Sequence, residues 1–408
     1  MQTRLPAALL ETADGRDAEA ILRKCVHCGF CTATCPTYQL LGDELDGPRG
    51  RISLIQQALE GAPVTRKTQL HLDRCLTCRA CETTCPSGVR YGRLLDIGRQ
   101  HVDKLVPRSP WQRLQRRALL LVLPRRGLFA MALAVGRLLR PLLPGRLRAA
   151  VPPARPAGAL PAAQHARRML LLEGCVQPAL APDINRAAAR VLDRAGISLV
   201  PVTGAGCCGA LAHHLSAEEQ ALQQARRNID AWWPEIERGA EGVVVTASGC
   251  GTMVKDYGEL LRGDPLYAGK AARVSELFLD LSQAVAAAAS SLPRAAAGGA
   301  RIAVHSPCTL QHGLQIRGVV EDLLRGAGYT LLPVADGHLC CGSAGTYSIL
   351  QSELSQRLLR NKLDALEAGA PQAIATANIG CLTHLAGGAK VPVRHWIELL
   401  DEAQTGAI

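Results

Sequence analysis

The sequence predicts a helical N-terminal domain followed by a duplicated α/β region. Residues 1–106 contain eight cysteines in two clusters and lack apolar, β-branched runs. Residues 107–165 are rich in Arg, Leu, Ala and Pro. From residue 166 onwards a cysteine-containing pattern occurs twice, and strand-like and helix-like segments alternate in each copy. We therefore divide the chain into a helical domain (1–106), a basic amphipathic linker (107–165) and two repeats (166–300 and 301–408).

Short helices between cysteine loops make up the predicted N-terminal domain. Helical spacing of apolar residues occurs at 17–24 and 50–59. The sequence Gly47-Pro48-Arg49-Gly50 is typical of a turn and begins the second of these helices.

The two repeats align on their cysteines. Cys175 aligns with Cys308, Cys207-Cys208-Gly209 with Cys340-Cys341-Gly342, and Cys250 with Cys381. Each copy contains a helix, a glycine stop and a short strand, at 192–202 and 324–334. Further helices are predicted at 216–232 and 351–366, and buried strands at 243–246 and 373–376.

Composition excludes several classes of protein. The chain has 408 residues, and its apolar runs fall short of the roughly 18 residues that a transmembrane helix needs. Aromatic residues make up 3%, too few for the stacking surfaces that bind single-stranded nucleic acid. The net charge of +11 is concentrated in one segment: residues 104–172 contain thirteen Arg, one Lys and no acidic residue, so the rest of the chain carries −3.

The chain contains sixteen cysteines. No apolar run near its start is long enough for the core of a secretory signal, so we expect a cytoplasmic location. In a reducing compartment, grouped cysteines are metal ligands or redox groups more often than disulfides.

The most specific motif is Cys-x2-Cys-x2-Cys-x3-Cys-Pro, which begins at Cys25 and again at Cys75. In two-cluster ferredoxins the first three cysteines of such a run bind one [4Fe-4S] cluster and the fourth binds the other. We therefore predict two [4Fe-4S] clusters and the following ligands: Cys25, Cys28, Cys31 and Cys85 for cluster one, and Cys75, Cys78, Cys81 and Cys35 for cluster two. Two zinc knuckles are the alternative, although zinc sites more commonly use two separated cysteine pairs.

Each repeat offers four further thiols: Cys175, Cys207, Cys208 and Cys250 in the first, and Cys308, Cys340, Cys341 and Cys381 in the second. This pattern resembles the Cys-Cys-Gly domain of heterodisulfide reductases, in which the last element is Cys-x-x-Cys; here Met253 and His384 occupy the final positions. The thiols could bind a cluster or zinc, with His384 or His213 as additional donors, or could be packed in a core without a cofactor. The sequence leaves these alternatives open.

The basic linker has the composition of a helix on an anionic membrane surface. Its arginines, among them Arg113, Arg116, Arg117, Arg125, Arg126, Arg137 and Arg140, interrupt apolar stretches at 118–123 and 128–135. A solvated linker or a docking face for an acidic partner is the alternative, and we expect no nucleic acid.

Dinucleotide and nucleotide-binding motifs are missing. No Gly-x-Gly-x-x-Gly follows a predicted strand, and no Gly-x4-Gly-Lys-Ser/Thr occurs. We therefore expect no flavin or nicotinamide on this chain, so that electrons must come from another subunit.

Taken together, the chain resembles the iron-sulfur subunits of bacterial glycolate oxidases (glycolate dehydrogenases) over residues 10–405. The similarity includes Cys25-Val26-His27-Cys28-Gly29-Phe30-Cys31, Glu173-Gly174-Cys175-Val176-Gln177-Pro178 and His305-Ser306-Pro307-Cys308-Thr309-Leu310-Gln311-His312.

The resemblance implies that flavin-binding partner subunits oxidise glycolate to glyoxylate, with D-lactate as a second candidate substrate, while this chain passes electrons to a quinone-type membrane acceptor. It implies no catalytic residue here, the eight N-terminal cysteines as cluster ligands, and peripheral attachment to the inner face of the cell inner membrane. The alternatives are an iron-sulfur subunit serving lactate or glycerol 3-phosphate, a heterodisulfide-reductase-like subunit, and a zinc-stabilised binding protein.

Overall fold

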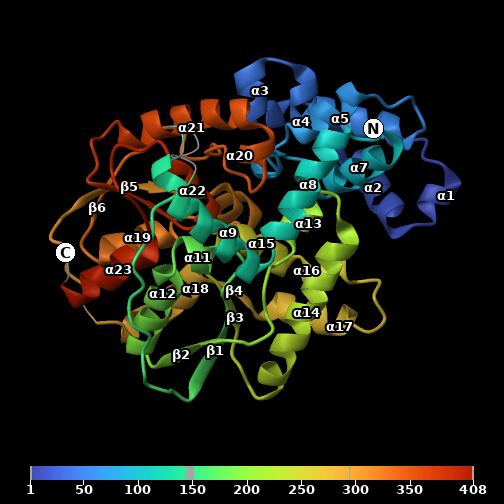
Figure 1. Ribbon diagram of the computed structural model, residues 1–408. Coiled ribbons are helices and arrows are strands. Elements are labelled where there is room, and N and C mark those ends of the chain that lie inside the picture. Colours follow the sequence, from blue (N-terminus) through green and yellow to red (C-terminus); the bar gives the residue numbers. More distant parts are fainter. Residues whose placement is uncertain (1, 143, 145–150, 294, 407–408) are drawn as a thin grey trace.

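The computed structural model describes residues 2–142, 144, 151–293 and 295–406 and contains a helical N-terminal domain that rests against two α/β units (Figure 1). Among the described residues, none before Arg167 belongs to a strand. The helices of this domain are α1 (Ala7–Leu10), α2 (Ala13–Lys24), α3 (Pro36–Leu41), α4 (Pro48–Leu59), α5 (Arg66–Asp73), α6 (Ala80–Thr84) and α7 (Tyr91–Leu105). A helical domain followed by an α/β region is therefore observed.

Both helices predicted in this domain form, and both begin earlier than expected. Helix α2 starts at Ala13 because the Thr12 hydroxyl caps it, accepting a hydrogen bond from the Gly15 amide at 3.0 Å. Helix α4 starts at Pro48, since the first turn of a helix needs no N–H donor at that position. Ile52 and Ile55 on α4 are buried in the core of the domain.

Each repeat forms a four-stranded parallel sheet with the same strand order, β2-β1-β3-β4 in the first and β6-β5-β7-β8 in the second. The strands are β1 (Arg167–Leu172), β2 (Ile197–Pro201), β3 (Val243–Val245), β4 (Phe278–Asp280), β5 (Arg301–His305), β6 (Thr330–Leu332), β7 (Ala373–Thr376) and β8 (Val393–His395). The strands predicted at 243–246 and 373–376 are β3 and β7. Short parallel strands joined by helices are buried on both faces, which explains their continuous apolar sequences.

The helices of the repeats follow the predicted pattern with shifted ends. The helix expected at 216–232 is α14 (Glu218–Glu237), which continues past Pro234, and the one expected at 351–366 is α21 (Ser352–Glu367). The other helices of repeat one are α11 (Gln177–Leu180), α12 (Asp183–Arg194), α13 (Ala210–His214), α15 (Ser248–Lys255), α16 (Tyr257–Leu260), α17 (Ala268–Leu277) and α18 (Leu281–Ala287). Those of repeat two are α19 (Val319–Gly326), α20 (Tyr347–Leu350), α22 (Ile379–Ala386) and α23 (Trp396–Thr405).

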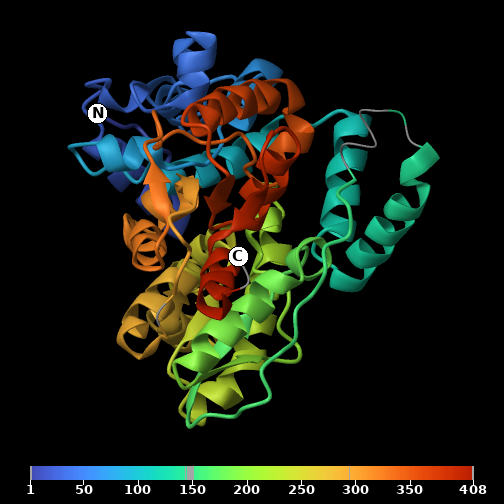
Figure 2. The ribbon, with the colours of Figure 1, turned by 90° about the vertical axis from the view of Figure 1, so that its left-hand side faces the viewer.

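The two repeats share one hydrophobic core, because each sends its last helix onto a helix of the other. Helix α23 of repeat two packs on α12 of repeat one, and α18 of repeat one packs on α19 of repeat two (Figure 2). Asp401 on α23 forms ion pairs with Arg190 and Arg194 on α12, at 2.6 and 2.8 Å. The repeats therefore form one folded unit.

The N-terminal domain is attached to the repeats by ion pairs as well as by the chain. Arg79 pairs with Asp256 at 2.9 Å, and Arg262 pairs with Asp17 at 2.6 Å. Cys78 and Leu76 share a small apolar cluster with Cys340 of repeat two. These contacts hold the cysteine loops in a defined position beside the second sheet.

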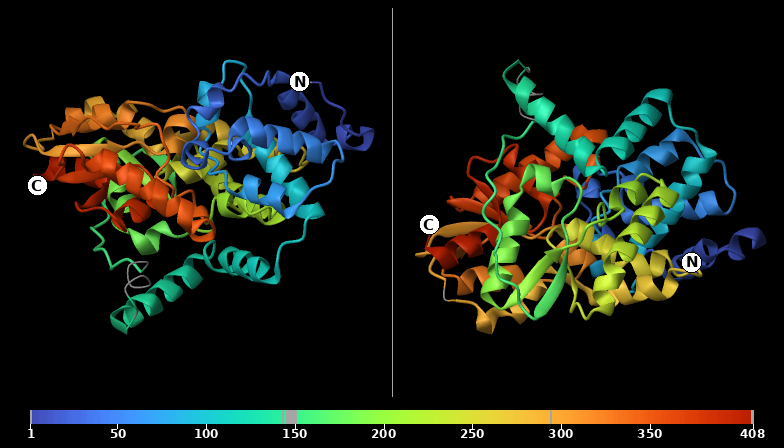
Figure 3. Two further views of the ribbon diagram at one scale, coloured as in Figure 1. Left: turned by 90° about the horizontal axis from the view of Figure 1, so that it is seen from above. Right: turned by 60° about the horizontal axis from the view of Figure 1, so that its bottom comes forward.

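The basic linker contains two helices, α8 (Pro110–Val122) and α9 (Arg126–Leu139), which project from the rest of the molecule as a V (Figure 3). No single helix in the described part of the chain has the length and apolarity to cross a membrane. The pair Pro110–Val122 and Arg126–Leu142 meets those criteria only when taken together, and it is bent by 107°.

Candidate metal centres

Five of the eight N-terminal cysteines border one hollow in the domain. Cys25, Cys28, Cys31 and Cys85 line this space, hollow one, together with Cys81, and its empty volume is about 430 Å³. The first three belong to the loop after α2, whereas Cys85 comes from the second motif, at the end of α6. Hollow one opens to solvent beside Cys28, Val26 and Phe30, which are all exposed.

Four cysteines line a second space. Cys35, Cys75, Cys78 and Cys81 border hollow two, with an empty volume of about 300 Å³. All four are buried. Hollow one therefore combines three cysteines of the first motif with Cys81 and Cys85 of the second, and hollow two combines three cysteines of the second motif with Cys35 of the first. Cysteines of both motifs meet at each hollow, as crossed ligation requires.

The two loops use the same backbone conformation at matching positions. The residue before the second cysteine of each motif has a left-handed backbone, with φ of 55° at His27 and 52° at Thr77. The residue after that cysteine is also left-handed, with φ of 85° at Gly29 and 58° at Arg79. Such conformations are rare outside glycine, so their repetition indicates loops shaped to turn three thiols towards one space.

The chemistry of these donors fits a positively charged occupant. Burial, and then the neighbouring thiols, raise the pKa of Cys31 to about 11. Burial also raises the pKa of Cys78 and of Cys81 well above the ordinary value. Thiols in this setting ionise only when a cation compensates their charge, and iron in a cluster provides that compensation.

Hollow two has polar neighbours that the motif does not reveal. The Tyr91 hydroxyl donates to Cys75 Sγ at 3.6 Å, and Arg51, which is 1% exposed, lines the hollow while paired with Asp46 at 3.3 Å. Hydrogen bonds and positive charge near a cluster favour its reduced form. Neither residue belongs to a motif, so only the three-dimensional structure identifies them.

Two arginines lie in or just after the second cysteine motif, Arg79 and Arg90. Arg79 lines hollow two, but its guanidinium pairs with Asp256 of repeat one. Arg90 pairs with Glu259. Both arginines therefore hold the N-terminal domain against repeat one, and their charge is largely compensated.

The thiols of each repeat are brought together. In repeat two, Cys308 Sγ lies 3.9 Å from Cys340 Sγ, and Cys341 Sγ lies within 4.8 Å of Cys381 Sγ. In repeat one, Cys175, Cys207, Cys208 and Cys250 are close enough to shift one another's pKa. The thiols of repeat two adjoin hollow two, because Cys340 and Cys308 pack in one cluster with Cys78.

The histidines proposed as additional donors have other partners. His213 Nε2 lies 3.1 Å from Asp96 Oδ2 on α7, across the boundary between the N-terminal domain and repeat one. His384 Nε2 lies 3.2 Å from the Ser355 hydroxyl.

The glycine of each Cys-Cys-Gly sequence is required by the backbone. Gly209 and Gly342 have φ of 97° and 90°. A Cβ atom on Gly342 would lie 2.6 Å from the Ser355 carbonyl oxygen on α21, and one on Gly209 would lie 3.0 Å from the Ala221 carbonyl oxygen on α14. Glycine therefore lets the cysteine pair approach the following helix closely.

Two known families match parts of the chain. Residues 21–89 match the family described as 4Fe-4S dicluster domain, and residues 169–255 and 302–386 each match the family described as Cysteine-rich domain. The first match contains all eight cysteines of the two hollows, and the other two lie within the repeats.

Similar proteins include three with informative descriptions. The Escherichia coli glycolate oxidase iron-sulfur subunit is 55% identical, with 99% of each chain covered. A probable glycolate oxidase iron-sulfur subunit of Bacillus subtilis is 30% identical, with 94% of each chain covered. Lactate utilization protein A of Bacillus subtilis is 25% identical over 57% of this chain and 99% of its own.

Proposed function

Because the chain belongs to the family of glycolate oxidase iron-sulfur subunits, we propose that it is the electron-transfer subunit of a glycolate-oxidising complex. In this proposal a flavin-binding partner oxidises glycolate to glyoxylate, and this chain transmits the electrons to a quinone-type acceptor. It carries no substrate site and no flavin of its own.

The two hollows, each bordered by cysteines of both motifs, are the observation that carries the proposal. Cys25, Cys28, Cys31 and Cys85 would hold one [4Fe-4S] cluster, and the four cysteines of hollow two would hold the second. Bound clusters supply one-electron redox chemistry. The chain itself contributes thiolate ligands, exclusion of water from hollow two, and a fixed spacing of the sites, since Cys81 borders both hollows.

The surface around hollow one suits a protein partner that delivers electrons. Val26 and Phe30 are 67% and 61% exposed at its rim. Hollow two is buried beneath contacts with repeat two, so hollow one is the more accessible position for the flavin-binding subunit.

Helices α8 and α9 support membrane contact. Their exposed apolar side chains include Trp111, Met131, Leu138 and the following Leu142, in a segment that also carries arginines and no acidic residue. Apolar side chains enter the lipid interface while arginines attract anionic headgroups. These features support the proposal that the protein lies in the cytoplasm, attached to the inner face of the cell inner membrane, where a quinone would be available.

Spectroscopy of the isolated complex tests the electron-transfer proposal. The tagged chain is purified anaerobically with its co-purifying subunits, and its visible iron-sulfur absorption is followed after addition of glycolate. Bleaching by glycolate is expected. If dithionite bleaches the sample and glycolate does not, the glycolate assignment is wrong, and lactate and glycerol 3-phosphate are tested next. A colourless, zinc-containing protein would exclude electron transfer.

Vesicle flotation tests the membrane contact separately. The purified complex is expected to float with vesicles that contain phosphatidylglycerol and to stay unbound with pure phosphatidylcholine. Leu138→Asp should reduce binding at the apolar face, whereas Leu266→Asp, at a residue 78% exposed on repeat one, serves as the matched control. Equal binding of the wild-type complex to both vesicle types would contradict the electrostatic part of the proposal.

A further inference from the structure

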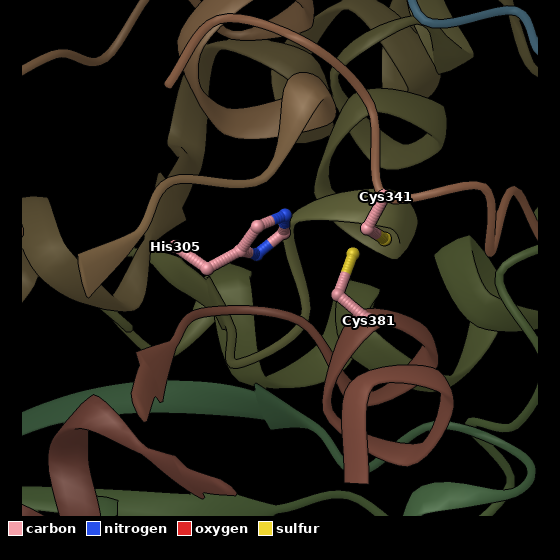
Figure 4. Close-up of side chains that lie close together, drawn as sticks. All are labelled: His305, Cys341 and Cys381. Atoms are coloured by element: carbon pink, nitrogen blue, oxygen red, sulfur yellow. The ribbon is translucent and has the colours of Figure 1, made fainter. Parts of the chain in front are cut away.

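A histidine of repeat two points towards two of the repeat's thiols. The ring of His305, at the end of β5, faces the sulfur atoms of Cys341 and Cys381 (Figure 4). The three potential ligand atoms lie within 4.8 Å of one another, and all three residues are buried. They come from three segments: a strand end, the Cys-Cys-Gly turn and the first turn of α22.

The imidazole of His305 has one satisfied nitrogen and one that is not. Its Nδ1 lies 3.0 Å from the Thr376 hydroxyl, while its buried Nε2 has no hydrogen-bond partner among the described residues. A hydrogen bond from Nδ1–H to this hydroxyl leaves the lone pair on Nε2 free. A second hydrogen bond of this kind, which fixes the ring and its tautomer, accompanies most histidines that bind metals.

The same positions in repeat one are apolar. In the sheet of repeat two, His305 is paired with Thr376; in the sheet of repeat one, the equivalent pair is Leu172 and Val245. Repeat two therefore has a potential metal ligand, His305, and the hydroxyl that orients it, Thr376, where repeat one has two aliphatic residues. Burying an unpartnered nitrogen is unfavourable unless something binds it, so this replacement indicates a ligand.

The sulfur donors are also prepared for a cation. Asn378 Nδ2 donates to Cys381 Sγ at 3.4 Å, an interaction that favours the thiolate. Cys341 Sγ lies within 4.8 Å of Cys381 Sγ, so both thiols can reach one ion. Two thiolates and a neutral imidazole are the donor set of zinc sites that keep a fourth, tetrahedral position for another ligand.

We propose that His305, Cys341 and Cys381 bind a single divalent metal ion of the zinc class in repeat two. This site is separate from the two hollows of the N-terminal domain. The ion joins β5, α22 and the turn that carries Cys340, and so holds that turn against Cys78 beside hollow two. Among the described residues, the thiols of repeat one form no such three-ligand group.

Metal analysis of the complex tests the proposal without reference to its activity. Zinc and iron are measured by mass spectrometry in the anaerobically purified wild type and in His305→Leu, which introduces the residue found at the equivalent position of repeat one. About one zinc per chain is expected in the wild type and close to none in the variant, with the iron content unchanged. His384→Gln is the matched control and should retain the zinc, because its ring is bonded to Ser355 instead.

Two further measurements keep the test decisive if His305→Leu does not fold. Zinc-edge X-ray absorption of the wild type should show two sulfur ligands at about 2.3 Å and a nitrogen at about 2.0–2.1 Å. Thr376→Val, which removes only the orienting hydroxyl, should weaken zinc retention against a chelator by roughly 10–100-fold. Absence of zinc, zinc retained at full occupancy in folded His305→Leu, or loss of iron instead of zinc would each overturn the proposal.

Discussion

The glycine of each Cys-Cys-Gly sequence provides a quantitative test of how the repeats are built. Gly342→Ala places a Cβ atom 2.6 Å from the Ser355 carbonyl oxygen and 2.9 Å from Leu358 Cβ. Neither atom can move without shifting α21. At Gly209 the nearest atoms to the added Cβ are the Ala221 carbonyl oxygen at 3.0 Å and the flexible Met253 Cε at 3.1 Å. The same substitution is therefore easier to accommodate in repeat one.

The expected cost follows from two contributions. A left-handed conformation costs a non-glycine residue roughly 1–2 kcal/mol, and this applies at both glycines. Overpacking adds about 1–3 kcal/mol where the neighbours are rigid, which applies at Gly342. We expect a loss of about 2–5 kcal/mol for Gly342→Ala and a loss nearer 1–2 kcal/mol for Gly209→Ala.

Far-UV circular dichroism at a fixed heating rate is a suitable assay, because unfolding of a cluster protein is irreversible and only apparent melting temperatures can be compared. At roughly 2–4 °C per kcal/mol, the apparent Tm should fall by several degrees in Gly209→Ala and by clearly more in Gly342→Ala. An unchanged Tm in Gly342→Ala, or a larger effect at Gly209, would refute the packing argument.

Three other predictions concern the N-terminal clusters, repeat one and the domain boundary. Cys28→Ser should remove cluster one and abolish acceptor reduction by the complex, while glycolate still reduces the flavin of the partner; full quinone reduction by this variant would refute the ligand assignment. Cys208→Ser should lower the apparent Tm and leave the iron content nearly unchanged, because Cys208 is buried in the core of repeat one. Loss of iron with an unchanged Tm would instead indicate a cluster in repeat one. Burial alone would lower the pKa of His213, but the neighbouring Asp96 carboxylate outweighs burial and raises this pKa. Burial alone would raise the pKa of Asp96, but His213 holds that pKa well below its usual value. The stability that His213 contributes is therefore complete below about pH 6.5 and is lost as the pH rises through its raised pKa. The stability that Asp96 contributes is complete above about pH 4 and is lost as the pH falls through its lowered pKa. The apparent Tm of the wild type should accordingly exceed that of His213→Gln by more at pH 6 than at pH 9, and a constant difference would contradict the ion pair.

Much of the architecture could be read from local sequence patterns. The cysteine spacing within residues 25–35 and 75–85 is a property of one short loop each, so it predicts which thiols can converge without knowledge of the rest of the chain. Periodicity and the internal repeat predicted the strands β3 and β7 and the helices α14 and α21, because buried parallel strands and amphipathic helices have distinct patterns. The errors were at helix ends, where capping by Thr12 and Pro48 decides the first residue.

The contacts between distant residues could not be read in the same way. His305 and Cys381 are far apart in the sequence, and only the register of β5 with β7 and the start of α22 bring them together. The pairing of His213 with Asp96, and the presence of Arg51 beside hollow two, likewise depend on how the domains and helices pack. Local spacing thus supports a prediction of the cluster ligands, since each loop determines its own shape. Tertiary packing alone decided which buried polar groups face them, because sequence distance carries no information about contacts across a core.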